Sequence, residues 1–154
     1  MYFKTIPLPS ALNQPEAEIL LRKVSIKETM PLDFTFKAVD VGTDKLFYGL
    51  EGKKDLKFTR LHTSFELFLP KLIVSLSKDP NAGFYRIRPG VIPIAIIGLI
   101  AFALIIGLIN TFRGLTDFER LLPFLVIGLG YAALIFIELK ITQSRVLKAL
   151  NKTV

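Results

Sequence analysis

The sequence of 154 residues contains no cysteine, no tryptophan and a single histidine, His62. Without cysteine the chain can form no disulfide, no thiolate metal site and no iron–sulfur cluster, and it has no thiol nucleophile. One histidine cannot assemble a histidine-rich zinc site. The sequence therefore excludes cysteine-based chemistry, and it is compatible with a reducing compartment.

Charge is missing from two long stretches near the end of the chain. The first runs from Val91 to Thr111 and the second from Leu121 to Ile137. At a rise of about 1.5 Å per residue they would span roughly 31 Å and roughly 25 Å as helices, close to a hydrocarbon thickness of about 30 Å. Glu138 and Lys140 follow the second stretch, and we expect their long side chains to snorkel toward water. The pattern predicts an integral membrane protein with a two-helix hairpin.

The hairpin divides the chain into three parts. We expect a cytoplasmic α+β domain over residues 1–90, a transmembrane hairpin over 91–139 and a cytoplasmic amphipathic tail over 140–154. Within the hairpin, the two spans are expected at about 91–111 and 120–139. Only a Pro-Gly pair joins the first part to the hairpin, so the domain should lie against the bilayer rather than swing freely.

Basic residues collect on both sides of the hairpin rather than at its turn. Residues 1–90 hold 14 Lys and Arg against 10 Asp and Glu, the loop 112–120 is neutral, and the segment 138–154 has four basic residues and one acidic residue. By the positive-inside rule, both termini lie in the cytoplasm and the short loop lies outside. We therefore expect a multi-pass protein of the bacterial cytoplasmic (inner) membrane. Since no dense basic run occurs, lipid headgroups explain the charges better than nucleic acid, which we do not expect as a partner.

The beginning of the chain shows a strand signal and then a helix signal. Residues 2–8 suit a short edge strand, closed by prolines that cannot donate to a central ladder. Asn13 as the N-cap, with Pro15 and Glu16 in the first turn, predicts a helix over about 14–25. Its apolar stripe is expected to consist of Ile19, Leu20, Leu21 and Val24.

From residue 33 to residue 90 the pattern is typical of four or five short antiparallel strands. The alternation begins at Phe34, and a long apolar stretch is interrupted at Pro70. In the last segment Tyr85 and Ile87 should face the same side of the sheet. The expected fold class is thus an α+β membrane protein: a small antiparallel-sheet domain with one helix, followed by a two-helix transmembrane hairpin with a cytoplasmic helical extension.

Neither predicted span has an ionisable residue at its centre. Ion pathways and proton relays usually depend on such groups, so we expect the hairpin to anchor the protein rather than to form a transport path. Each span does carry small residues at four-residue spacing, which let helix backbones approach closely in lipid. Two uses remain open, packing within the hairpin and packing against another subunit. The residues are Ala103, Gly107, Gly128 and Ala132.

No segment carries a specific catalytic, cofactor-binding or metal-binding motif. His62 lies beside Thr63 and Ser64, but adjacent residues on a strand face opposite sides, so this spacing does not make a catalytic triad. The acidic residues are spaced as cap, turn and surface residues are, without a calcium-loop or glycosidase pattern. We therefore predict a protein that is not an enzyme and that binds no cofactor and no metal ion.

A sequence pattern extends from Leu46 to Ile96, into the first apolar stretch. It consists of Phe47, Gly49, Phe58, Arg60, Ser64, Phe65, Leu69, Pro70, Gly83, Ile87, Arg88 and Pro93. The pattern resembles that of a loose family of small uncharacterised bacterial inner-membrane proteins, in which a short cytoplasmic αβ domain precedes two transmembrane helices. The chain departs from it at Glu66, Leu67 and Phe68, which separate the two halves of one motif. The resemblance implies this architecture and brings no known activity.

These features lead to two functional hypotheses. The first is a membrane-anchored scaffold or accessory subunit of a larger complex, whose partners are the lipid bilayer and either other membrane-protein subunits or a second copy of the chain. The alternative is a membrane-tethered sensor or a module that binds an anionic ligand or lipid headgroup. Candidate contacts for an anionic headgroup or a partner are Arg60, Arg86, Arg88, Arg145 and Lys148.

Overall fold

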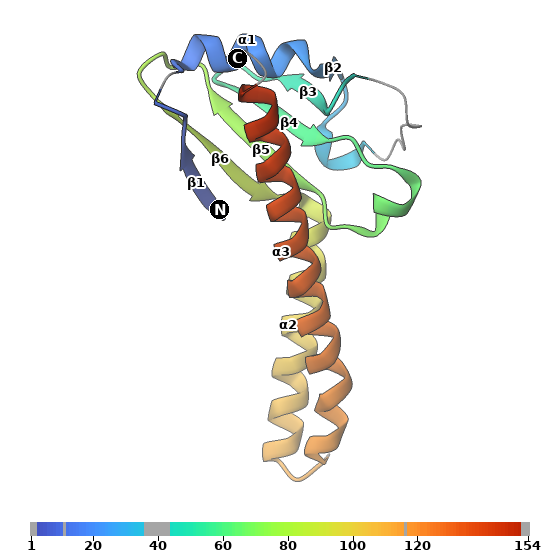
Figure 1. Cartoon of the computed structure of the whole chain (residues 1–154). Coiled ribbons are helices and arrows are strands. Elements are labelled where there is room, and N and C mark those ends of the chain that lie inside the picture. The colour runs from blue at the N-terminus through green and yellow to red at the C-terminus, as the bar shows by residue number, and fades with distance from the viewer. Residues whose placement is uncertain (1–2, 11, 36–43, 116, 152–154) are drawn as a thin grey trace.

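The computed structural model describes residues 3–10, 12–35, 44–115 and 117–151, and the account below covers these residues. They form one six-stranded sheet, three α-helices and three short 3-10 helices (Figure 1). The strands are β1 (Lys4–Pro7), β2 (Ser25–Lys27), β3 (Phe47–Glu51), β4 (Asp55–Arg60), β5 (Leu72–Ser77) and β6 (Phe84–Pro89). The helices are α1 (Gln14–Lys23), α2 (Val91–Phe112) and α3 (Leu122–Leu150), and the 3-10 helices are η1 (Leu32–Phe34), η2 (Ser64–Phe68) and η3 (Phe118–Leu121).

The sheet is mixed, and its strand order is β1-β6-β5-β4-β3-β2. Strands β3 to β6 pair in antiparallel fashion, as their alternation predicts, and β1 is an edge strand antiparallel to β6. However, β2 runs parallel to β3, so the prediction of a purely antiparallel sheet is wrong. A parallel pair needs a crossover connection of about a dozen residues or more, and the segment 28–46 between β2 and β3 is long enough to provide one.

Two local predictions differ from the structure. Asp33 and Phe34 lie in η1 rather than in a strand, and residues 36–43, where that strand was expected to continue, lie outside the described residues. The segment before Pro70 forms η2, because Thr63 and Glu66 make a capping box that starts a helical turn. The strand predicted in this segment therefore begins only after the proline, as β5.

Helix α1 begins where the sequence predicts. The Asn13 Oδ1 accepts a hydrogen bond from the Glu16 N–H at 2.9 Å, and the Glu16 Oε2 accepts one from the Asn13 N–H at 3.1 Å. Leu21 is buried as expected, but Ile19 is 64% exposed, so its assignment to the buried stripe is wrong. Ala17 takes its place, because it precedes Leu21 by four residues and so lies on the same helical face.

The main core lies on one face of the sheet, which α1 and the second half of α3 cover (Figure 1). Tyr85 and Ile87 are both buried in it, so the predicted alternation of β6 is confirmed. A smaller cluster, formed by Leu32, Tyr48, Leu61 and Ile73, lies on the other face. The main core contains Phe47, Phe58, Leu72, Val74, Leu76, Tyr85 and Ile87 from the sheet, and Ala17, Leu21, Val146, Ala149 and Leu150 from the helices.

Helices α2 and α3 are long and apolar enough to cross a membrane, judged by length and composition. They leave the sheet domain at one end, run side by side and are joined at the far end through η3 (Figure 1). Only 6% of the most apolar stretch of α2, and 11% of that in the second helical segment, is buried within the molecule. These two apolar stretches are therefore not buried in a globular core, and their exposed apolar surface is larger than proteins usually leave in water.

Two of the four small residues, Gly107 and Gly128, contact another part of the hairpin. A Cβ atom added at Gly107 would clash with the side chain of Leu121, and one added at Gly128 would lie 3.3 Å from an α2 side chain. Ala103 is half-buried, whereas Ala132 is exposed. Gly128 thus lets α3 approach α2, and Gly107 makes room for Leu121 of η3, whereas Ala132 is exposed although it lies one turn from Gly128 on the same face of α3.

Candidate functional site

A buried ion pair joins the sheet to α3 at the end of the domain from which the long helices leave. Arg60 ends β4 and lies on the same sheet face as Phe58, two residues earlier. Its Nε and Nη2 donate to the two carboxylate oxygens of Glu138 at 2.9 and 2.7 Å, and both side chains are 0% exposed. The prediction that Glu138 snorkels to water is therefore wrong, because its charge is satisfied inside the protein by a bidentate partner.

Three more side chains complete the arrangement, which we call the Arg60 cluster: Arg60, Glu66, Glu138, Thr142 and Arg145. The Arg60 Nη1 donates to the Glu66 Oε1 at 2.5 Å, and the Arg145 Nη2 lies 3.6 Å from the same oxygen. One turn along α3 from Glu138, the Thr142 Oγ1 donates to the Glu138 Oε1 at 3.0 Å. The cluster therefore ties β4, η2 and α3 together.

The electrostatics of the cluster keep Arg60 and Glu66 charged. Burial would raise the pKa of the Glu66 carboxyl, but the Thr63 N–H and the Arg60 guanidinium lower that pKa to about 2. Burial likewise would lower the pKa of Arg60, but the carboxylates of Glu138 and Glu66 raise it overall. Both groups are thus ionised near neutral pH, and each depends on its partners because an unpaired charge in this position is costly.

A second polar contact fixes the start of α2. The Asp33 Oδ1 accepts a hydrogen bond from the Val91 N–H at 2.9 Å, while the Asp33 Oδ2 accepts one from the Arg88 Nη2 at 3.1 Å. A carboxylate in this position also faces the positive end of the helix dipole. Each long helix therefore has its own charged attachment to the sheet domain: Glu138 on α3, and Asp33 at the start of α2.

The five basic residues proposed as headgroup or partner contacts do not form one site. Arg60 and Arg145 converge on Glu66, and Arg60 presents no surface to a headgroup. Arg88 pairs with Asp33. The other two lie apart from these, since the Arg86 guanidinium stacks on the Phe84 ring with 4.8 Å to the centroid, and Lys148 is exposed near the end of α3.

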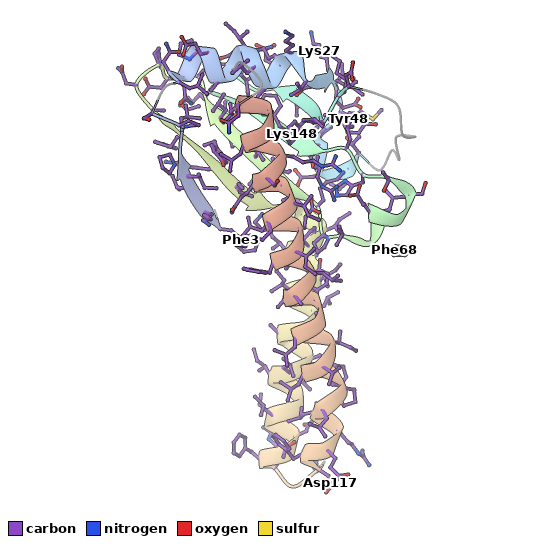
Figure 2. The ribbon with its side chains drawn as sticks, viewed as in Figure 1. Phe3, Lys27, Tyr48, Phe68, Asp117 and Lys148 are labelled. Atoms are coloured by element: carbon purple, nitrogen blue, oxygen red, sulfur yellow. The ribbon has the colours of Figure 1, made fainter. Side chains whose placement is uncertain are left out.

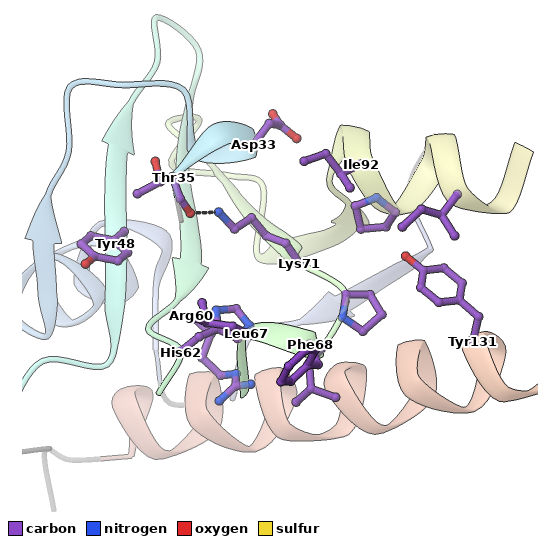
Figure 3. Close-up of a pocket in the computed structure, with 14 residues that line it drawn as sticks. Asp33, Thr35, Tyr48, Arg60, His62, Leu67, Phe68, Lys71, Ile92 and Tyr131 are labelled. Carbon is purple, nitrogen blue, oxygen red and sulfur yellow. Dashed lines mark hydrogen bonds between the residues drawn. The ribbon is translucent and has the colours of Figure 1, made fainter. Parts of the chain in front are cut away.

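Between the two attachments lies a pocket of about 130 Å³ (Figure 3). Its polar lining includes His62 and Lys71, and its apolar lining includes Phe68 from η2 and Ile92 and Ile96 from α2. Tyr131 reaches into its lining from α3. The pocket therefore touches the sheet domain and both long helices.

Lys71 contributes a buried ammonium group to this pocket. Its Nζ donates to the carbonyl oxygen of Leu32 at 2.9 Å and to that of Thr35, the contact drawn in Figure 3. Burial lowers the pKa of Lys71 to about 8, although the charge of Asp33 acts in the opposite direction. The Lys71 amine therefore gains or loses its proton at a pH that can be reached in experiments on the folded protein.

His62 is the other buried polar group in the pocket lining. It is 7% exposed, and its Nε2 makes no hydrogen bond to any residue that the structure describes. The nearest carboxylate oxygen that pairs with it is the Glu138 Oε1, at 3.6 Å. The neighbouring hydroxyl of Thr63 instead donates to Glu66, so the local string around His62 forms no nucleophile–base pair.

Sequence reasoning missed both attachments. The pairing of Arg60 with Glu138 joins residues 78 positions apart, and no local pattern contains both. Two signals were available: Glu138 is a carboxylate directly after an apolar stretch, and Arg60 continues the strand alternation of Leu56 and Phe58. In the part of the chain that the structure describes, no three His, Cys, Asp or Glu side chains are grouped to hold a metal ion.

Comparison with known proteins adds no family or function to this geometry. The chain matches no family model, and neither curated proteins nor solved structures give a significant match. The chain is an α+β protein with a mixed sheet and two long apolar helices. The Arg60–Glu138 pair attaches α3 to the sheet domain, and Asp33, which pairs with Arg88, attaches the start of α2.

Replacing Glu138 with Gln should destabilise the protein by about 3–5 kcal/mol, because Arg60 then stays buried without its compensating charge. The measurement is the unfolding free energy of the full chain in detergent. The control is Glu51→Gln, which removes a carboxylate that pairs with Arg22 and Lys78 at the surface and should leave stability unchanged. The double variant Arg60→Met with Glu138→Met should be more stable than Glu138→Gln alone. Equal losses in Glu51→Gln and Glu138→Gln would contradict the buried pair.

Lys71 should make the protein more stable as the pH rises. Its pKa is about 8 in the folded chain, against an ordinary value of 10.5. Between these values the unfolded chain binds more protons at this position than the folded chain, so the stability contributed by Lys71 increases with pH across that window. Thermal unfolding of the native protein and of Lys71→Met, compared at both ends of the window, measures this contribution. If the difference between the two proteins does not change with pH, the amine titrates normally in the folded state.

Proposed function

We propose that this protein is a membrane-anchored scaffold or accessory subunit of the bacterial cytoplasmic membrane. Helices α2 and α3 would cross the bilayer, with the sheet domain and both termini on the cytoplasmic side. One observation carries the proposal: α3 is a single helix of 29 residues whose first half is apolar and exposed, while its second half is part of the domain core. Such a domain cannot swing on a linker, which suits a role in holding a partner at a set height and orientation.

The exposed surface of the long helices supports their place in a bilayer. Large apolar side chains are exposed along both, and each would contribute roughly 1.5–3 kcal/mol when transferred out of water. At about 1.5 Å per residue, α2 has a length of roughly 33 Å, enough to cross a hydrocarbon core. The backbone polar groups of a helix are satisfied internally, as that environment requires. The most exposed of these side chains include Leu99, Phe102, Val126 and Leu129.

The distribution of charge supports the orientation. The connection between the long helices is neutral overall, whereas the sheet domain and the end of α3 carry the basic excess. Under the positive-inside rule this charge distribution supports a cytoplasmic position of the domain. It also keeps the domain on the same side as the second half of α3, with which it shares its core.

One part of the domain surface is suited to rest on lipid. Phe68 is 85% exposed on η2, and Figure 2 shows it at the end of the domain from which the long helices leave. Leu67 beside it is also exposed. Aromatic side chains are enriched at the headgroup level of membrane proteins. We infer that η2 rests in the membrane interface.

The long helices also offer a surface for a second membrane protein. A Cβ atom added at Gly98 on α2 or at Gly130 on α3 would meet nothing within 4 Å. Small residues that face outward from a hairpin allow another helix to approach closely in lipid. A partner subunit, or a second copy of the chain, would pack here without disturbing the contacts that Gly107 and Gly128 make inside the hairpin.

Single-tryptophan variants test the membrane position, because the chain has no tryptophan of its own. In vesicles that contain brominated lipids, the fluorescence of Phe102→Trp should be quenched by bromine deep in the acyl chains. That of Phe68→Trp should be quenched by bromine near the headgroups. Lys27→Trp is the control, since Lys27 lies at the opposite end of the domain and should not be quenched (Figure 2). An unquenched Phe102→Trp would contradict insertion, and equal quenching of Phe68→Trp and Lys27→Trp would contradict the position of the domain.

The scaffold role predicts a stable association in mild detergent. The extracted native protein should have a mass above that of its monomer, through a co-purifying subunit or a second copy. Gly130→Leu should reduce this association by about ten-fold, because a bulky side chain prevents the close approach of another helix. Leu129→Ile, which keeps the side-chain volume at a neighbouring exposed position, should leave it unchanged. A native protein that is strictly monomeric and carries no partner would overturn the scaffold proposal.

A further inference from the structure

The pocket beside the Arg60 cluster has two chemically different sides. His62 and Lys71, which come from the sheet domain, lie on its polar side together with Asp33 and Arg60, whose charges are already paired with Arg88 and Glu138. Ile92 and Ile96, from the first two turns of α2, supply part of its apolar side, together with Phe68 of η2. A molecule that fills both sides has to be amphiphilic, with its polar group toward the sheet and its apolar group along α2.

The polar side has groups suited to an anionic head. The Nε2 of His62 is buried and makes no hydrogen bond to a described residue, since the Glu138 Oε1 that lies 3.6 Å away accepts from Arg60 and Thr142 instead. Leaving such a nitrogen unsatisfied is costly. An oxygen atom of a ligand head would satisfy it. The ammonium group of Lys71, held in place by the carbonyl oxygens of Leu32 and Thr35, contributes positive charge on the same side (Figure 3).

The size of the pocket limits what it encloses. Its volume is about 130 Å³, whereas sites that enclose a drug-sized ligand have roughly 300–1,000 Å³. A headgroup fits this space, but a whole lipid does not. The remaining acyl chain would therefore lie outside, along the exposed apolar surface that continues from Ile96 toward Leu99 on α2.

We propose that this pocket binds the anionic head of a membrane amphiphile, with His62 and Lys71 at the head and the acyl chain along α2 beyond Ile96. The head is an oxyanion such as a phosphomonoester. The proposal rests on the proposed membrane position, because only a bilayer supplies such a molecule beside α2. None of the five basic residues that the sequence favours is needed as the contact.

The experiment uses the full chain in a maltoside detergent and titrates it with dioctanoyl phosphatidic acid, followed by calorimetry. We expect saturable binding of one molecule per chain. Ile96→Trp fills the apolar side and should weaken binding by about ten-fold or more. Ile105→Trp, the same change at an exposed position further along α2 and on the opposite face of the helix from Ile96, should leave binding unchanged. Lys71→Gln, whose folding is checked by circular dichroism, should also weaken it about ten-fold.

Two further titrations identify the recognised chemistry. Dioctanoylglycerol, which lacks the anionic head, should bind at least about ten-fold more weakly, and inorganic phosphate alone should not compete at equal concentration. Competition by phosphate would indicate a free-anion site, and equal binding of dioctanoylglycerol would indicate a purely apolar one. Either result, or an equal effect of Ile96→Trp and Ile105→Trp, overturns the proposal. If Phe102→Trp is quenched by brominated lipid but phosphatidic acid does not saturate the protein, this inference fails while the membrane position stands.

Discussion

The ion pair between Arg60 and Glu138 is the contact on which the relation between the sheet domain and the long helices depends. Its two side chains are fully buried and come from positions far apart in the chain. Buried ion pairs often add little net stability over an apolar pair of similar volume, but losing one partner is severe. We infer that the pair mainly fixes how α3 is rotated and positioned on the sheet. A rotation of α3 by one residue would turn Glu138 away from β4 by about 100°, so a single arrangement of helix on sheet is favoured.

The continuity of α3 extends this constraint along the molecule. The same helix has its exposed apolar half beside α2 and its buried half against α1 and the sheet. Asp33 attaches the start of α2 to the same domain. The domain and the two long helices thus form one mechanical unit with two charged attachments, and the pocket lies between those attachments. A group bound there would contact the sheet domain, α2 and α3 together. A tilt of the long helices relative to the domain would change these contacts.

Local features of the fold were predictable from the sequence where all the residues that determine them lie in one short segment. The Asn13–Glu16 capping box starts α1, and the alternation of Tyr85 and Ile87 defines the buried face of β6. Predictions were wrong where contacts with a distant part of the chain decided the outcome. Ile19 looked apolar and helical, but the position of the sheet made Ala17 the buried residue. The parallel pairing of β2 depends on the path of the chain between the strands, which alternation does not encode.

The sequence by itself determined the two long apolar helices, because twenty or so uncharged residues allow few other structures. It determined the start of α1 and most of the strands as well, though not β2. It also contained every charge used in the two attachments. Only the tertiary structure decided which charges meet. The alternation of Leu56, Phe58 and Arg60 puts Arg60 on the buried sheet face, and Glu138 directly follows an apolar run, but neither position shows which partner its charge has. Folding places both in one buried volume, where burying either charge is tolerable only beside the other.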